Sequence, residues 1–196
     1  MRKIFFTLLL AIISNGCYNE TVNDIVFAQK LSNVSECRDG CTIVTGDSNV
    51  FWYNWRFIPG DVCNTSFGGT PISYVTGSMN RLSSVNPIRV IIWTGQNNYL
   101  QSIDKIRIEY DKLFDAIKKL SCPVYIISVH PYYEGRDNVQ MILMNDYLKS
   151  HDGDGYTFID IYDDIEKCGE VCFMNSGHLS DAGFKVIQER VLERIE

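Results

Sequence analysis

Residues 41–49, CTIVTGDSN, hold the transition that decides the fold. The stretch begins with β-branched and apolar residues, which predicts a short strand over residues 41–45. Gly46, Asp47 and Ser48 follow as a tight turn, because glycine permits backbone geometry that a side chain would block. A helix is predicted next, over residues 50–57. A strand that passes into a helix in this way is typical of α/β domains.

Three further runs resemble the first and predict strands over residues 89–94, 124–129 and 156–161. Each is almost continuously apolar, which indicates strands buried on both faces, as in a parallel sheet. Helical patterns lie between and after the runs. Apolar residues recur at three- and four-residue steps over residues 103–120 and 141–148, and again after Ser180, a predicted N-cap. We therefore expect a doubly wound α/β domain of three layers, with a mainly parallel sheet and right-handed crossovers.

The N-terminus predicts export. Arg2 and Lys3 precede an unbroken apolar run over residues 4–13, and small or polar residues follow, so residues 1–16 are interpreted as a signal peptide. The run is too short to span a bilayer as a helix, so an uncleaved membrane anchor is the weaker alternative. No integral membrane span is expected after cleavage. Lipid attachment at Cys17 is the alternative. Residues 17–196 contain no linker or repeat and are expected to form a single domain.

Composition narrows the function classes. The net charge is −6 and basic clusters are missing, so nucleic acid is not expected as a partner. Six of the seven cysteines lie beyond Cys17, an even number that favours disulfides in an exported chain. Their pairing stays open. Zinc is the alternative for the two CxxxC pairs, but neither pair has a histidine close by in sequence, so no metal is expected.

The residues that carry chemistry should follow the strands, because ligands of doubly wound sheets bind at the carboxyl ends of the strands. Ser48 stands there after the first run, although Asp47 or Ser48 could simply cap the next helix. Asn97, in the turn GQNN after the second run, offers an amide that can stabilise an oxyanion. A polar loop with Gly68 and Gly69 can bring a backbone N–H close to the same oxygen.

His178 lies in the segment MNSGHLSDAGF, just before the last predicted helix. It is one of only three histidines in the chain. His130 and His151 have no comparable setting and are interpreted as structural or solvated. His178 is therefore the candidate general base.

Taken in this order, the four segments resemble the SGNH (GDSL-like) hydrolases, whose signature is a GDS turn, a glycine, a GxND-like turn and a C-terminal DxxH. The resemblance covers residues from 41 to the last helix and implies a flavodoxin-like fold and a serine esterase without a cofactor. It implies Ser48 as nucleophile and His178 as base. It also implies an oxyanion hole of the Ser48 amide, Gly69 (or Gly68) and Asn97. The GQNN turn looks like that of the platelet-activating-factor acetylhydrolase catalytic subunits, and HLSDAG is similar to the SGNH domains attached to membrane acyltransferases.

One position departs from this pattern, because Asn175 stands where the family has the aspartate of DxxH. In a serine protease the same change lowers kcat about 10⁴-fold, since the carboxylate selects the histidine tautomer. Three explanations compete: a dyad held by Asn175 or a backbone carbonyl, a substitute carboxylate such as Asp181, or loss of activity. The alternatives to an esterase are therefore a silent binding module and an O-acyltransferase.

The expected substrate is a small carboxylic ester or an acylated glycan or lipid, with an acetyl or short acyl group. Phe51, Trp52, Tyr53 and Trp55 follow the nucleophile and are candidates to line an acyl or sugar site. Packing of the first helix is the alternative role for this aromatic cluster.

Overall fold

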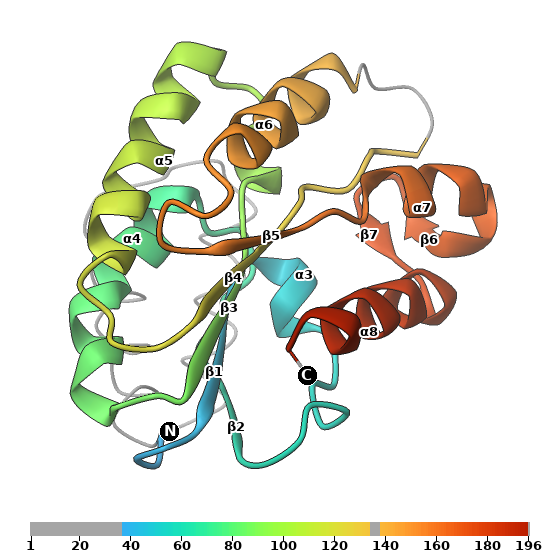
Figure 1. Cartoon of the computed structure of the whole chain (residues 1–196). Helices are drawn as coiled ribbons and strands as arrows, with labels where there is room; N and C mark the ends of the chain where they lie inside the picture. The colour runs from blue at the N-terminus through green and yellow to red at the C-terminus, as the bar shows by residue number, and fades with distance from the viewer. Residues whose placement is uncertain (1–36, 134–137, 196) are drawn as a thin grey trace, which may run out of the picture.

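Five short parallel strands form the central sheet of the computed structural model, which describes residues 37–133 and 138–195 (Figure 1). Their order is β2-β1-β3-β4-β5. The strands are β1 (Thr42–Gly46), β2 (Val62–Asn64), β3 (Arg89–Trp93), β4 (Val124–Ile127) and β5 (Thr157–Ile159). Every neighbouring pair in this sheet is parallel. The predicted doubly wound α/β class is therefore confirmed.

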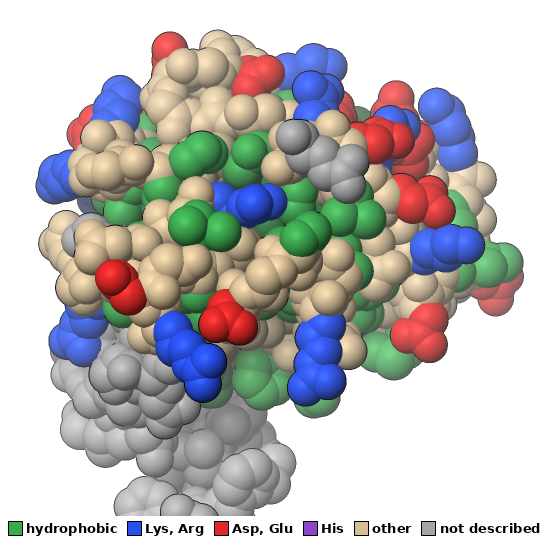
Figure 2. All heavy atoms as spheres, turned by 60° about the horizontal axis from the view of Figure 1, so that its bottom comes forward, with side chains coloured by type: hydrophobic (Ala, Val, Ile, Leu, Met, Phe, Trp, Pro, Cys, Tyr) green, Lys and Arg blue, Asp and Glu red, His purple; other side chains and the backbone are tan. Residues whose placement is uncertain are grey.

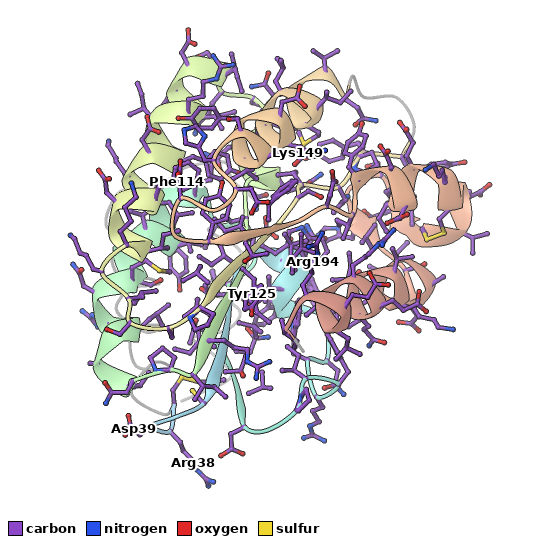
Figure 3. All side chains as sticks on the ribbon, in the orientation of Figure 1. Arg38, Asp39, Phe114, Tyr125, Lys149 and Arg194 are labelled. Atoms are coloured by element: carbon purple, nitrogen blue, oxygen red, sulfur yellow. A yellow bond between two sulfur atoms is a disulfide. The ribbon has the colours of Figure 1, made fainter. Side chains whose placement is uncertain are left out.

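Helices cover both faces of the sheet (Figure 1). One face packs against α4 (Ile72–Leu82), α5 (Ile103–Ile117) and α6 (Val139–Ser150), and the other against α3 (Ser48–Phe51), α7 (Tyr162–Cys168) and α8 (Asp181–Ile195). Successive residues of β1 alternate between the layers: Ile43 belongs to the first core cluster and Val44 to the second. Apolar side chains on both faces explain the continuous runs in the sequence. Figure 3 shows how side chains fill the space between the layers, with Phe114 of α5 among them.

One local prediction was wrong, and two local elements were not predicted. The helix expected over residues 50–57 ends at Phe51, because the chain then turns and buries Trp55, whose indole N–H donates to the Val50 carbonyl oxygen at 3.0 Å. Strand β2 was missed because it has only three residues, which include a half-buried cysteine and an exposed asparagine. A two-stranded antiparallel pair, β6 (Phe173–Asn175) and β7 (His178–Leu179), was also not predicted.

Two disulfides join four of the six cysteines beyond Cys17: Cys37–Cys63 and Cys168–Cys172 (yellow bonds in Figure 3). The first ties β2 to the chain before β1, and the second closes the turn before β6. Cys41 and Cys122 are free, and burial raises the pKa of both thiols. The expected disulfides are thus present in part. The predicted signal peptide and Cys17 lie outside the described residues.

Charged side chains of both signs are mixed on the face shown in Figure 2, where the amino ends of the strands come forward. Within residues 37–133 and 138–195, no helix has the length and hydrophobicity to cross a membrane. The same residues hold no group of three or more His, Cys, Asp or Glu side chains suited to a metal ion.

Gly46 of β1 lies against the Trp93 backbone of β3, and Gly46→Ala is expected to unfold much of the protein. A Cβ atom there would overlap the Trp93 carbonyl oxygen and lie 2.7 Å from Val50 Cγ2, at a φ of +154°. The loss in free energy of unfolding should exceed the about 1–3 kcal/mol of ordinary overpacking. We therefore expect the Tm of Gly46→Ala to fall by at least about 6 °C. Thermal denaturation measures the change. Gly60→Ala is the matched control, since Gly60 has a φ of +89° but open space around its Cα; an equal loss in both variants would contradict the explanation.

Candidate active site

Ser48 is the first residue of α3, directly after β1, at the carboxyl edge of the sheet. Asp47 caps this helix: its carboxylate accepts the Asn49 N–H at 2.9 Å. Burial raises the pKa of Asp47 to about 7, although the Asn49 hydrogen bonds oppose that shift. The capping role considered from the sequence therefore falls to Asp47. The Ser48 side chain is directed elsewhere.

The Ser48 hydroxyl meets the His178 imidazole. Ser48 Oγ lies 3.0 Å from His178 Nε2, although the two residues are 130 positions apart. His178 Nδ1 in turn lies 3.1 Å from Asn175 Oδ1. The antiparallel pairing of β6 and β7 places Asn175 opposite His178. Ser48, His178 and Asn175 thus form one hydrogen-bonded line, in the order that a serine nucleophile, a histidine base and an orienting group have in acyl-transfer enzymes.

Asn175 selects the tautomer of the imidazole. Its Oδ1 also accepts the backbone N–H groups of Gly177 and His178, each at 3.0 Å. Because these donors identify the atom as the oxygen, the hydrogen at His178 Nδ1 points to it. Nε2 then carries the lone pair that faces the Ser48 hydroxyl. This is the tautomer that a general base requires.

Asp181 does not take the place of the family aspartate in this arrangement. It begins α8 and lines a cavity between that helix and the segment after α3, while the imidazole is held by Asn175. Of the three explanations weighed for the departure at position 175, the geometry therefore agrees with the one in which Asn175 holds the ring.

The His178 imidazole is half-buried, and this burial lowers its pKa below the ordinary histidine value. We therefore expect kcat/KM for an ester to fall toward low pH only below the usual histidine range, because the base must be neutral. A pH profile of kcat/KM measures this acid limb. An acid limb above pH 6.5, the unperturbed histidine value, would contradict the burial argument.

Of the predicted oxyanion donors, the glycine loop lies next to Ser48. A Cβ atom at Gly68 would be 3.8 Å from Ser48 Cβ, so this glycine faces Ser48. Gly69 follows with a φ of +76°, a conformation that favours glycine. Asn97 is exposed, and its amide donates to the Thr70 carbonyl oxygen at 3.1 Å, which ties the two loops together. The amide has a second hydrogen for a substrate oxygen.

The neighbouring Asn98 has a structural role, which sequence analysis did not predict. It is fully buried, accepts the Ile72 N–H at 3.0 Å and donates to Glu109 at 2.8 Å. The resemblance to the GxND-like turn selects Asn97 for the oxyanion hole but does not say where the Asn98 side chain lies. Their roles follow from the turn of the short 3-10 helix Gln96–Asn98, which buries one side chain and exposes the other.

We expect alanine substitutions of the two asparagines to affect different properties of the protein. Asn97→Ala should lower kcat about 10²–10³-fold with little change in Tm, because it removes a donor to the oxyanion. Asn98→Ala should lower Tm, because it leaves the Ile72 N–H without its acceptor. Steady-state kinetics and thermal denaturation of both variants provide the measurement. Equal effects on kcat in folded proteins would contradict the assignment.

The other two histidines lie outside this line. His130 is fully buried and packs edge-on against Trp93, and burial lowers its pKa to about 4. His151 follows α6 and contacts the Tyr147 carbonyl oxygen at 3.0 Å. Neither of these two imidazoles forms a hydrogen bond with Ser48 in the described part of the chain. His178 is the histidine that the fold brings to the Ser48 hydroxyl.

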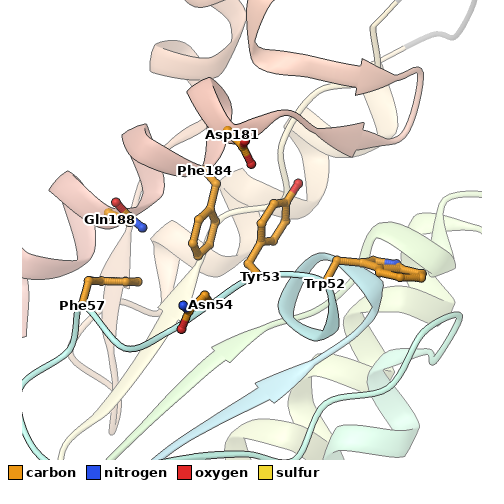
Figure 4. A pocket seen from close by; sticks show the side chains of 7 residues that line it. All are labelled: Trp52, Tyr53, Asn54, Phe57, Asp181, Phe184 and Gln188. Atoms are coloured by element: carbon orange, nitrogen blue, oxygen red, sulfur yellow. The ribbon is translucent and has the colours of Figure 1, made fainter.

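A cavity of about 410 Å³ opens between the segment after α3 and helix α8, the segments that follow the proposed catalytic line of Ser48, His178 and Asn175 in the chain (Figure 4). Tyr53 stacks on Phe184 with the ring centroids 4.1 Å apart, and its hydroxyl donates to the Leu179 carbonyl oxygen. Burial, together with the charge of Asp181, raises the pKa of Tyr53 to about 12, so it remains a neutral donor. The cavity is lined by Trp52, Tyr53, Asn54, Phe57, Asp181, Phe184 and Gln188.

The aromatic cluster predicted from the sequence is therefore divided. Trp55 packs in the core at 3 % exposure, whereas Trp52 is 67 % exposed at the cavity. Tyr53 does both: it is half-buried on Phe184 and lines the cavity. Packing and cavity lining are thus both present in this short segment.

No family model matches the chain, and no curated protein matches it in sequence. Solved structures do match. A protein described as a platelet activating factor from Streptococcus pneumonia superposes with a TM-score of 0.78 at 11 % identity, covering 97 % of this chain and 99 % of that one. A GDSL-like lipase from Bacteroides thetaiotaomicron gives 0.72 at 11 % identity, over 85 % and 95 % of the two chains.

A third match is Axe2, an acetylxylan esterase from Geobacillus stearothermophilus, as a catalytic mutant. It superposes with a TM-score of 0.63 at 14 % identity and covers 80 % of this chain and 94 % of that one. At such identities the likeness concerns the fold. The chain has the fold of the SGNH (GDSL-like) hydrolases, as its resemblance to them in sequence implies.

Proposed function

We propose that this protein is a serine esterase that hydrolyses carboxylic esters with acetyl or short acyl groups. The observation that carries the proposal is the line from Ser48 Oγ to His178 Nε2 at 3.0 Å and from His178 Nδ1 to Asn175 Oδ1 at 3.1 Å. Hydrogen-bonded serine and histidine with an orienting third group are typical of acyl transfer through a covalent intermediate. The SGNH fold, shared with a GDSL-like lipase and an acetylxylan esterase, supports the same reaction class.

In the proposed reaction, His178 Nε2 takes the hydroxyl proton as Ser48 Oγ attacks the ester carbonyl carbon. The negative charge that develops on the carbonyl oxygen is stabilised by the Ser48 amide, the Gly69 (or Gly68) amide and the Asn97 side chain. His178 then gives its proton to the departing alcohol. Water, activated by His178, releases the acid from Ser48. Every proton transfer passes through one imidazole, and no cofactor is needed.

We also propose that the protein acts outside the cytoplasm as a single domain over residues 17–196. The predicted signal peptide over residues 1–16 supports export, and two disulfides suit an oxidising compartment. Lipid attachment at Cys17 is the alternative. Treatment with a thiol-specific reagent under denaturing, non-reducing conditions tests the disulfides, since Cys168 and Cys172 should react only after reduction.

The proposal is tested with a fluorophosphonate probe and a panel of esters on the purified protein. We expect the probe to label Ser48, as located by mass spectrometry. We also expect 4-nitrophenyl acetate to be cleaved faster than a long-chain 4-nitrophenyl ester. Labelling of Ser48 without hydrolysis of any ester would contradict the esterase. Transfer of the acyl group to an added saccharide would then favour an O-acyltransferase. A lack of both labelling and turnover would favour a silent binding module.

A further inference from the structure

We infer that the cavity between the segment after α3 and helix α8 binds a sugar ring of a neutral O-acylated glycan, with Trp52 as the ring on which the sugar stacks. The inference rests on the proposed esterase function of the same site. It assigns a substrate class, a glycan ester rather than a lipid ester, and it gives roles to residues outside the catalytic line.

The position of the cavity joins it to the reaction. Its walls come from the two segments that follow Ser48 and His178 in the chain (Figure 4). The backbone N–H of Trp52 donates to the Ser48 carbonyl oxygen at 3.1 Å, and the Tyr53 hydroxyl donates to the carbonyl oxygen of Leu179, the residue after His178. Asp181 follows His178 by three positions. The cavity thus begins four residues after Ser48 and three residues after His178. On this ground we infer that one substrate can place a ring in the cavity and an acyl group at Ser48.

The chemistry of the walls suits a sugar. Aromatic rings of Trp52 and Phe57 lie on the same cavity as the amides of Asn54 and Gln188 and the carboxylate of Asp181. A sugar ring offers apolar C–H groups to an aromatic face and hydroxyls to amide and carboxylate groups. Pockets for small ligands range over about 300–1,000 Å³, and this cavity of about 410 Å³ is at the lower end.

The same walls argue against the other ligand classes. An acyl chain would remove water from the exposed Asp181 carboxylate without replacing its hydrogen bonds, which is unfavourable. An anionic head group would be repelled by that carboxylate, and among the described residues no Lys or Arg lines the cavity. A neutral ring with several hydroxyls avoids both costs. This is why we assign a neutral glycan.

Trp52 provides an intrinsic reporter of binding. The chain has three tryptophans, and Trp55 and Trp93 are 3 % and 2 % exposed while Trp52 is 67 % exposed. Collisional quenching of fluorescence by acrylamide therefore reports mainly on Trp52. In the Ser48→Ala protein, O-acetylated xylo- or cello-oligosaccharides are expected to lower the Stern–Volmer slope at least twofold. The double variant Ser48→Ala, Trp52→Phe sets the background of the two buried rings.

A kinetic comparison tests the same assignment in the active protein. We expect Trp52→Ala to lower the ratio of kcat/KM for the O-acetylated oligosaccharide to kcat/KM for 4-nitrophenyl acetate at least tenfold, mainly through KM. Leu100→Ala is the matched control, since Leu100 is 82 % exposed, follows Asn97 in the chain and does not line the cavity. This control should keep the ratio of the unmodified protein.

The outcomes separate the two proposals. If neither oligosaccharide protects Trp52, or if the ratio is unchanged in Trp52→Ala, the glycan assignment is overturned even when 4-nitrophenyl acetate is still cleaved. Protection by ethyl octanoate in place of the sugars would also overturn it, in favour of an acyl chain. If the protein cleaves no ester but the sugars protect Trp52, the glycan site stands and the esterase fails.

Discussion

Ser48→Ala is expected to lower kcat for 4-nitrophenyl acetate by about 10⁴-fold or more and to abolish fluorophosphonate labelling. Ser48 Oγ, which lies 3.0 Å from His178 Nε2, is the atom that would bond to the acyl group. Alanine has no nucleophilic atom to replace it. Members of a catalytic triad act as a unit, so loss of the nucleophile alone removes nearly the whole effect of the triad. Initial rates over a range of ester concentrations give kcat for both proteins.

The matched control for this variant is Ser73→Ala, an exposed serine in α4 that does not touch the catalytic line. It should keep the rate and the labelling of the unmodified protein. Near-ultraviolet circular dichroism of both variants tests that each is folded. A folded Ser48→Ala protein that retained more than about a hundredth of the rate would place the nucleophile elsewhere.

Asn175→Asp is expected to raise kcat/KM for 4-nitrophenyl acetate by about 10²-fold or more, with about 10⁴-fold as the limit set by the reverse change in a serine protease. The fold should survive, because a carboxylate oxygen can accept the same three N–H groups that Asn175 Oδ1 accepts now. Its charge would stabilise the imidazolium that forms as Ser48 loses its proton. Steady-state kinetics across pH provides the measurement.

The same variant has a signature in the pH profile. Burial alone lowers the pKa of His178 in the unmodified protein, and a carboxylate at position 175 adds an opposite charge that raises it. The acid limb of kcat/KM should therefore move to higher pH in Asn175→Asp. Asn175→Ala, the second variant, removes the acceptor and should lower kcat. If Asn175→Asp gave no gain while Ser48 was still labelled, the imidazole would need no charged partner, as in a dyad held by neutral acceptors.

The fold could be predicted largely from local patterns. Runs of β-branched residues predicted four of the five parallel strands, and the steps of three and four residues predicted α5 and α8. Strand β2 and the β6–β7 pair were missed because segments of two or three residues have no period to detect. The helix over residues 50–57 was predicted too long because burial of Trp55 outweighs the local helical pattern.

The sequence by itself determined the class of the fold and which residue types stand at the carboxyl ends of the strands, because apolar periodicity and turn residues are local properties. Only the tertiary structure decided that Ser48 meets His178 across 130 positions and that Asn175, rather than Asp181, holds the imidazole. It also decided which asparagine of GQNN is buried and that Trp52 faces a cavity while Trp55 packs in the core. Such contacts depend on how the layers pack together, and no short stretch of sequence contains that information.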